Sequence, residues 1–173
     1  MMQIRFADPE DARAVAEIHV EAWRAAYAGI LPAAYLAALT VSSRQVMWEQ
    51  ILAEKQGDLQ VAMAGDRMLG WIHTGPGREA GSAAEDAEIR AFYVSPAVWS
   101  KGVGRELWVS ARTHLLTQGQ RQCHLWVLAQ NTRAIGFYQA AGFEWDKSPT
   151  KTMALGGSRV DELRFSCRLA VEA

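Results

Sequence analysis

A short loop at residues 98–104, VWSKGVG, contains two glycines and a lysine and joins a segment typical of a strand to a segment typical of a helix. The first backbone N–H groups of a helix have no partner within the helix, and they point outward at the positive end of the helix dipole. A tight glycine turn between a strand and a helix N-terminus therefore predicts a binding site for an anion such as phosphate.

Two nucleotide-binding motifs with glycine loops fit these residues poorly. A Walker A loop ends in Lys-Ser or Lys-Thr after its glycines, whereas Lys101 precedes Gly102 and Gly104 and no Ser or Thr directly follows them. A dinucleotide-binding fingerprint requires a third glycine and the first strand of the sheet, and this loop has neither. A second glycine-rich stretch, GPGREAG from Gly75, leads into no helix start, so we interpret it as a connection.

The elements that must position the loop alternate between helices and strands. The first third predicts a short strand, QIRFA, and then helices that begin near residues 9, 32 and 42. A hairpin around residues 65–66 follows, and the second half reads strand, helix, strand, helix and strand before the alternating stretch RVDELRFSCRLAV. This pattern predicts an α/β fold of the mixed α+β kind, with a sheet of about seven strands flanked by four or five helices.

Composition limits the class of protein. The chain has 173 residues, of which 50% are hydrophobic and 21% charged, and its net charge is −1. These values predict one soluble globular domain over residues 1–173 and no nucleic-acid partner. Cys123 and Cys167 have the spacing of neither a disulfide framework nor a metal site, so we expect buried thiols and no metal. The absence of a leader pattern and of a spanning apolar stretch predicts a cytoplasmic protein without membrane association.

Two consecutive motifs resemble those of a known family. The stretch EIRAFYVSPAVWSKGVGRELW, followed by LWVLAQNTRAIGFYQAAGF, is similar to the two central motifs of the Gcn5-related N-acetyltransferases (GNAT family), over about residues 88–143. The order of the motifs, their spacing and the types of element that carry them all match the family pattern. The resemblance implies a GNAT-like, largely antiparallel central sheet and a core that binds acetyl-coenzyme A (acetyl-CoA).

The resemblance assigns the glycine loop to the pyrophosphate of acetyl-CoA, since Gly102 and Gly104 allow the backbone to approach without a Cβ in the way. Family members have Gln or Arg where this chain has Trp99, so the resemblance supports no side-chain contact there. Lys101 is either a phosphate ligand or a solvated surface lysine. The strand before the loop pairs with pantetheine in the family, and the Asn at the start of the next helix is an N-cap, a pantetheine contact or both. The residues expected to bind the cofactor are therefore Phe92, Val94, Trp99, Ser100, Lys101, Gly102, Val103, Gly104, Asn131 and Tyr138.

Two residues are candidates for proton transfer. Strict alternation along AEIRAFYV places Glu88 on the same face as Phe92 and Val94, and its position resembles that of a glutamate that is the general base in several family members. An amine acceptor arrives mostly protonated and must lose a proton before it attacks. The alternative for Glu88 is a surface carboxylate paired with Arg90 or a lysine. Tyr138, in FYQAAGF, matches the family tyrosine that protonates the departing thiolate, a role that suits a phenol.

The resemblance places the acceptor pocket around the first helices. Trp23 and Tyr27 lie four residues apart on one helix face and are candidates for the wall of an apolar or cationic slot, with core packing as the alternative. Glu21 and Glu49 are candidate counter-charges for a cationic amine, or solvated surface carboxylates. This region also resembles, less specifically, a branch of the family that acetylates polyamines and small amines.

These residues together predict an N-acetyltransferase that transfers the acetyl group of acetyl-CoA directly to a primary amine of a small molecule, polyamine-like or amino-acid-like, in a ternary complex. Two alternatives stay open. One is a noncatalytic acyl-CoA-binding or sensing domain, and the other is a peptide or protein N-acetyltransferase with a groove open at both ends. Family habit implies a homodimer, for which the alternating C-terminal strand would offer an edge.

Overall fold

The computed structural model describes residues 1–170, in which seven strands and five α-helices follow one another in mixed order. The strands are β1 (Met2–Phe6), β2 (Asp58–Ala64), β3 (Arg67–Pro76), β4 (Asp86–Val94), β5 (Gln122–Leu128), β6 (Glu144–Leu155) and β7 (Ser158–Arg168). The helices are α1 (Ala12–Ala26), α2 (Ala33–Ala38), α3 (Val41–Ala53), α4 (Val103–Thr117) and α5 (Thr132–Ala140). Short 3-10 turns at Pro9–Asp11 and Pro96–Val98 precede α1 and the loop before α4.

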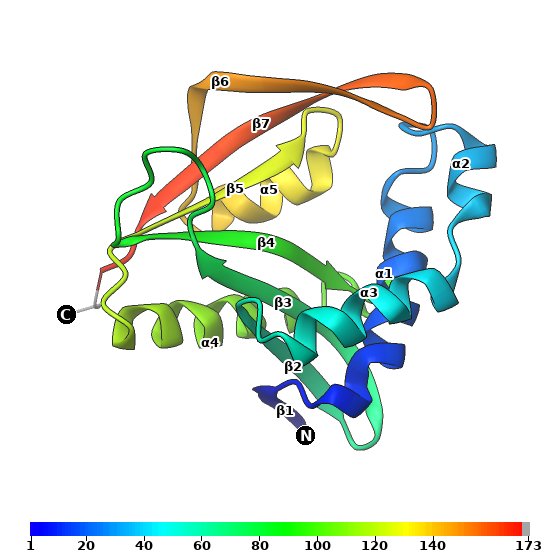
Figure 1. Cartoon of the computed structure of the whole chain (residues 1–173), viewed down its shortest axis with the longest axis horizontal. Helices are drawn as coiled ribbons and strands as arrows, with labels where there is room; N and C mark the ends of the chain where they lie inside the picture. The colour runs from blue at the N-terminus through cyan, green and yellow to red at the C-terminus, as the bar shows by residue number, and fades with distance from the viewer. Residues whose placement is uncertain (171–173) are drawn as a thin grey trace.

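The strands form one sheet in the order β1-β2-β3-β4-β5-β7-β6 (Figure 1). Every neighbouring pair is antiparallel except β4 and β5, which run parallel. The parallel pair requires a crossover, and α4 provides it by returning the chain along the sheet. The predicted mixed, largely antiparallel sheet flanked by helices is confirmed.

The C-terminal strand lies inside the sheet. β7 is flanked by β5 and β6, so β1 and β6 are the edges of the sheet. The expectation that the C-terminal strand offers an edge is wrong, because β6 turns back and pairs along β7 as a long hairpin. The strand also ends at Arg168, earlier than the alternating pattern suggests, and Val171 lies outside the described residues. The homodimer stays a prediction.

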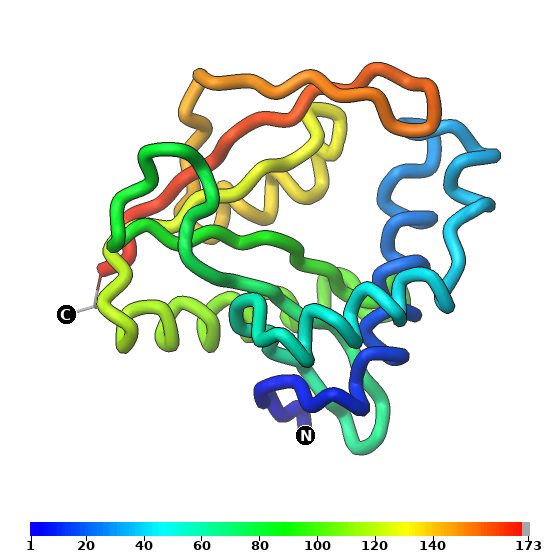
Figure 2. Tube along the Cα trace, in the orientation of Figure 1, coloured from blue at the N-terminus to red at the C-terminus, as the bar shows by residue number. Residues whose placement is uncertain are grey.

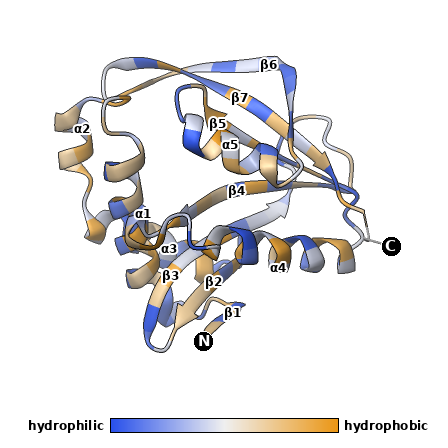
Figure 3. Ribbon diagram, turned by 180° about the vertical axis from the view of Figure 1, so that it is seen from behind, coloured by the Kyte–Doolittle hydropathy of each residue, from blue (hydrophilic) through white to orange (hydrophobic). Residues whose placement is uncertain are grey.

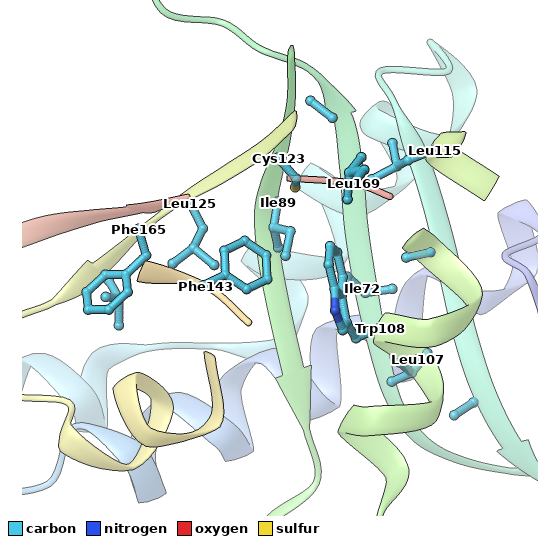
Figure 4. Close-up of a cluster of buried hydrophobic side chains, with 14 of the residues drawn as sticks. Ile72, Ile89, Leu107, Trp108, Leu115, Cys123, Leu125, Phe143, Phe165 and Leu169 are labelled. Carbon is cyan, nitrogen blue, oxygen red and sulfur yellow. The ribbon is translucent and has the colours of Figure 1, made fainter. Parts of the chain in front are cut away.

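Helices cover both faces of the N-terminal half of the sheet. α1 and α3 pack on one face, where the buried rings of Trp48 and Trp71 lie 4.7 Å apart between centroids. On the other face Leu107 and Trp108 of α4 pack beside Ile72 of β3 (Figure 4). Burial of each such side chain stabilises the fold by about 1.5–3 kcal/mol. These strands therefore form a firmly packed support for the loops at their ends.

The C-terminal half of the sheet extends away from this support. α5 packs against the cluster that includes Phe165 of β7, whereas β6 is mostly exposed and appears white and blue along much of its length (Figure 3). The turn between β6 and β7 reaches the N-terminal helices, where Gly156 packs against Tyr35 of α2 (Figure 2). Leu155 and Val160 join the same apolar cluster as Tyr35. The hairpin thus bridges the two halves of the molecule.

Within residues 1–170, no helix combines the length and the apolar character needed to cross a membrane.

Candidate active site

β4 and β5 separate halfway along their length. Their parallel pairing ends at Ile89 and Leu125, and beyond these residues the strands diverge (Figure 1). A cavity of about 470 Å³ opens at this place. Its walls come from α1, β4, β5, α5 and the loop before α4, with Leu155 and Glu162 contributed by β6 and β7. One cavity therefore joins the predicted phosphate loop to the predicted acceptor wall.

A β-bulge changes the facing of the first half of β4. The register between β3 and β4 shifts once and leaves Arg90 without a partner residue in β3. Ile89 consequently packs in the same hydrophobic cluster as Phe92, although strict alternation puts these two on opposite faces. Glu88, next to Ile89, lies on the other face of the strand. The expectation that Glu88 shares a face with Phe92 and Val94 is wrong, because the bulge inserts one residue into the alternation.

Glu88 is held by an arginine. The residue is 6% exposed, and its carboxylate accepts two hydrogen bonds from the Arg78 guanidinium, at 2.6 and 2.9 Å. Burial raises the pKa of Glu88, but the hydrogen bonds and charge of Arg78 outweigh burial and leave this pKa below its usual value. Glu88 is not among the described residues that line the cavity. Glu88 agrees with the alternative of a paired surface carboxylate only in being paired, because the carboxylate is buried and its partner is Arg78, not Arg90 or a lysine.

The loop before α4 presents unpaired backbone donors to the cavity. Gly102 is the N-cap of α4 at a φ of +86°, a left-handed value that glycine adopts readily. A Cβ on Gly104 would lie 3.2 Å from Phe137, so glycine allows α4 to approach α5 closely. Within the part of the chain that the structure describes, five cavity-lining amides donate no hydrogen bond to the protein, those of Ser100, Gly102, Val103, Gly104 and Arg105. Converging amides at a helix N-terminus are the geometry of an anion site.

Trp99 and Lys101 use their side chains differently. Trp99 lines the cavity, and its Nε1–H donates to the Val94 carbonyl oxygen at 2.8 Å. The Arg133 guanidinium lies 3.6 Å from the centre of the Trp99 ring. Lys101 Nζ donates to the Ala97 carbonyl oxygen at 3.2 Å, and Lys101 is absent from the described lining of the cavity. Trp99 thus anchors the loop to β4, while the Lys101 side chain corresponds to the surface alternative.

The sequence reasoning missed two arginines at this end of the cavity. Arg105 lies in the first turn of α4 and Arg133 in the first turn of α5, and both line the cavity. The Arg133 guanidinium lies over Trp99 of the loop, and Arg105 adds a second cationic residue to the same part of the lining. Two arginines there favour a ligand with several negative charges. The sequence could have indicated both residues, because Arg105 directly follows Gly104 and Arg133 lies two residues after Asn131.

α5 supplies the opposite wall. Asn131 caps this helix as predicted, since its side-chain oxygen accepts a hydrogen bond from the Ala134 amide at 3.2 Å. Tyr138 lines the cavity, and within the described residues its hydroxyl makes no hydrogen bond. Burial, together with the nearby Tyr93, raises the pKa of Tyr138 well above its usual value. Tyr138 is therefore a neutral phenol at physiological pH with its O–H free to donate into the cavity.

Aromatic side chains line the end of the cavity that α1 forms. Trp23 and Tyr27 pack edge to face with ring centroids 4.9 Å apart, and the hydroxyls of Tyr27 and Tyr93 lie 3.4 Å apart. Trp23 and Tyr27 both line the cavity and both belong to an apolar cluster. Each residue therefore fits both alternatives, a pocket wall and core packing. Glu21 and Glu49 are not part of the described lining.

A sequence model of the acetyltransferase (GNAT) family matches residues 13–143, which is most of the chain. The protein belongs to this family. The family, the fold and the enzyme class predicted from the two central motifs are confirmed by this match.

Individual relatives are also N-acetyltransferases by name. The chain is 28% identical over 163 residues to an uncharacterized N-acetyltransferase of Bacillus subtilis, covering 94% of this chain and 91% of the relative. It is 26% identical over 148 residues to the spermidine N(1)-acetyltransferase of Thermoplasma acidophilum, covering 83% of this chain and 88% of the relative.

Among solved structures, the PaiA N-acetyltransferase of Thermoplasma acidophilum in complex with coenzyme A superposes with a TM-score of 0.77, at 22% identity and over 97% of this chain and 99% of that one. YncA of Salmonella typhimurium, solved with acetyl-CoA, superposes with a TM-score of 0.74, at 21% identity and over 100% of this chain and 96% of that one. At these identities the likeness shows the shared fold.

Proposed function

We propose that this GNAT protein uses acetyl-CoA to acetylate a primary amine of a small molecule by direct transfer in a ternary complex. One observation carries the proposal: a single cavity joins the unpaired amides at the N-terminus of α4 to the aromatic wall of α1, and Tyr138 is part of its lining. A donor bound at one end and an acceptor bound at the other would meet inside the fold, where proximity lowers the entropic barrier to reaction.

The residues at the loop fit a coenzyme A group. The five unpaired amides and the guanidinium groups of Arg105 and Arg133 suit the phosphate oxygens. Gly102 and Gly104 leave the backbone accessible, and the diverging inner edges of β4 and β5 leave room for an extended pantetheine arm beside Phe92 and Val94. When bound, acetyl-CoA supplies an activated acetyl group as a thioester.

Tyr138 is the proposed general acid. A phenol is protonated at physiological pH, and the Tyr138 hydroxyl forms no hydrogen bond within the described residues, so its O–H can donate to a leaving sulfur as negative charge develops there. Glu88 fits the role of general base less well, since Arg78 holds its carboxylate outside the cavity lining. A proton path from the amine to Glu88 would have to run through water past the bulge at Arg90.

The position of the β6–β7 hairpin favours a small acceptor over a peptide. A peptide acetyltransferase would need a groove open at both ends, whereas here Gly156 packs against Tyr35 and Leu155 lines the cavity. The hairpin therefore narrows the acceptor end of the cavity. Acceptors that are short and unbranched are expected to enter most easily.

An amine screen tests the proposal. Release of free coenzyme A thiol is measured for the purified protein with acetyl-CoA and a panel of diamines, monoamines, amino acids and short peptides. We expect turnover with small amines, and a kcat lower by about 10²-fold or more in Tyr138→Phe with the affinity for acetyl-CoA within about twofold of wild type. Tight binding of acetyl-CoA without turnover of any amine would contradict the enzyme and favour the noncatalytic sensor.

A further inference from the structure

One carboxylate lines the cavity within the described residues, and it belongs to Glu162 of β7. Glu162 is two residues from Val160 on the same strand face, and Val160 packs with Tyr27 and Leu128 in the apolar cluster at the acceptor end. Glu162 also pairs in register with Leu128 of β5, another lining residue. The carboxylate therefore lies on the sheet face that closes the cavity opposite α1.

Within residues 1–170 the Glu162 carboxylate forms no hydrogen bond and no ion pair. Burial raises the pKa of Glu162, and the charge of Lys151 opposes this rise. A lysine is nevertheless its direct neighbour in the sheet, because Lys151 of β6 pairs with Glu162 in register. The Lys151 ammonium instead lies 3.7 Å from the centre of the Trp126 ring and 4.0 Å from Glu79 Oε1. Lys151 therefore acts on Glu162 only through its charge, and the hydrogen-bonding positions of the Glu162 carboxylate are open to a cation that enters the cavity.

Charge is distributed unevenly along the cavity. Arg105 and Arg133 belong to the end where α4 and α5 begin, and Glu162 belongs to the end where β7 faces α1. A third lining arginine, Arg90, donates its guanidinium hydrogen bonds to the carbonyl oxygens of Gln56 and Pro76. The negative charge of Glu162 contributes to the raised pKa values of Tyr27 and Tyr93, after burial in both cases. The cavity is therefore suited to an anionic ligand at one end and a cationic ligand at the other.

Glu162 stands apart from the proposed general acid. Tyr138 packs against the apolar cluster that includes Phe143, whereas the neighbours of Glu162, Val160 and Leu128, belong to the separate cluster around Tyr27. Tyr27 and Tyr93, whose hydroxyls lie 3.4 Å apart, line the same cavity as Tyr138 and Glu162. A carboxylate at the cluster around Tyr27, apart from the cluster that holds Tyr138, would reach an acceptor at a second group, not at the nitrogen that is acetylated.

We propose that Glu162 binds the ammonium group of the acceptor that is not acetylated, so that the preferred acceptors are short diamines whose two nitrogens are joined by an alkyl chain. The aromatic rings of Trp23, Tyr27 and Tyr93 would cover the alkyl chain, and the hairpin would limit its length. This assignment rests on the proposed N-acetyltransferase function and adds to it the residue that selects the acceptor.

Two acceptors and three variants test the assignment. Thiol release is measured with 1,4-diaminobutane and with n-butylamine, which lacks the second ammonium, for the wild type, Glu162→Gln, Glu162→Asp and Asp161→Asn. Asp161 is the control because it is the exposed neighbour on the opposite face of β7, where it accepts a hydrogen bond from Thr152 at 2.6 Å. Titration of the diamine into each protein saturated with coenzyme A provides a readout that does not depend on turnover.

We expect wild type to prefer the diamine, and Glu162→Gln to raise its KM for the diamine about 10- to 100-fold while the KM values for n-butylamine and acetyl-CoA change less than about threefold. Glu162→Asp, which keeps the charge, should keep part of the preference, and Asp161→Asn all of it. If Glu162 had only a structural role, Glu162→Gln would instead weaken the binding of both amines and of acetyl-CoA together.

The outcomes separate the two proposals. Turnover of amines with the same diamine preference in wild type and Glu162→Gln would overturn the role of Glu162 and leave the N-acetyltransferase intact. Diamine binding that Glu162→Gln abolishes, without turnover by the wild type, would overturn the enzyme and support the site. A wild type that neither binds nor prefers the diamine would overturn the role of Glu162.

Discussion

Replacing Gly102 by aspartate should separate cofactor binding from folding. Gly102 is the N-cap of α4 at φ +86°, and a Cβ built there meets no atom within 4 Å. A left-handed backbone costs a residue with a Cβ about 1 kcal/mol, least for Asn and Asp. A carboxylate at a helix N-terminus regains about 0.3–1 kcal/mol from the helix dipole. The stability of Gly102→Asp should therefore stay within about 1 kcal/mol of wild type.

The same carboxylate would stand where the phosphates of acetyl-CoA must approach the amides. Two like charges about 5 Å apart repel each other by about 1–3 kcal/mol for effective dielectric constants between about 80 and 20. Each 1.4 kcal/mol is a factor of about ten in affinity. We expect the Kd for acetyl-CoA to rise about 5- to 150-fold, with the larger values at low salt.

Gly119→Asp is the matched control. Gly119 follows the other end of the same helix at φ +83°, and a Cβ there also meets no atom within 4 Å. Its carboxylate would face the negative end of the dipole, so Gly119→Asp should lose about 1–2 kcal/mol of stability and keep the wild-type Kd. Isothermal titration with acetyl-CoA and urea denaturation, both at one fixed salt concentration, measure the two quantities.

The reasoning about the loop would be refuted by either of two results. One is a Kd for Gly102→Asp that equals the wild-type value, which would mean that the phosphates do not meet the N-terminus of α4. The other is an equal loss of affinity in both variants, which would mean that the loss follows from helix stability rather than from the loop.

Two further predictions concern Arg133 and His19. Arg133→Ala should weaken acetyl-CoA binding about tenfold at low salt and flatten its salt dependence, because it removes a charge stacked at 3.6 Å on Trp99. Arg133→Lys keeps the charge and should keep most of the salt dependence. Equal salt slopes in wild type and both variants would contradict this prediction. Burial lowers the pKa of His19 to about 3, and its Nδ1 accepts a hydrogen bond from the Trp48 indole at 3.1 Å. The unfolded chain binds this proton below about pH 6.5 and the folded chain does not, so the stabilising contribution is present above that pH and falls by about 2 kcal/mol from pH 7 to pH 5. Urea denaturation at both pH values should show a smaller decrease in His19→Gln, and an unchanged decrease would refute the assignment.

Much of the site was predictable because its parts are local. The residues of the loop before α4 adjoin one another in sequence. Glycine at positions 102 and 104 already indicates a backbone that must turn tightly or approach another group closely, as Gly102 and Gly104 do. Asn131 caps α5 through a bond that spans three residues. Trp23 and Tyr27 meet because a helix brings residues four apart together. Arg105 and Arg133 were equally local and were overlooked.

The sequence by itself therefore determined the family, the order of the elements and the glycine turn before α4, since each depends on short-range patterns. Tertiary structure alone decided three things. The bulge at Arg90 moved Glu88 away from Phe92, because an inserted residue breaks alternation without changing composition. Pairing with β6 buried β7 inside the sheet. Glu162 reached the cavity because strand pairing brings together residues that lie far apart in the chain, and no spacing in an alternating strand marks which carboxylate will meet a cleft formed elsewhere.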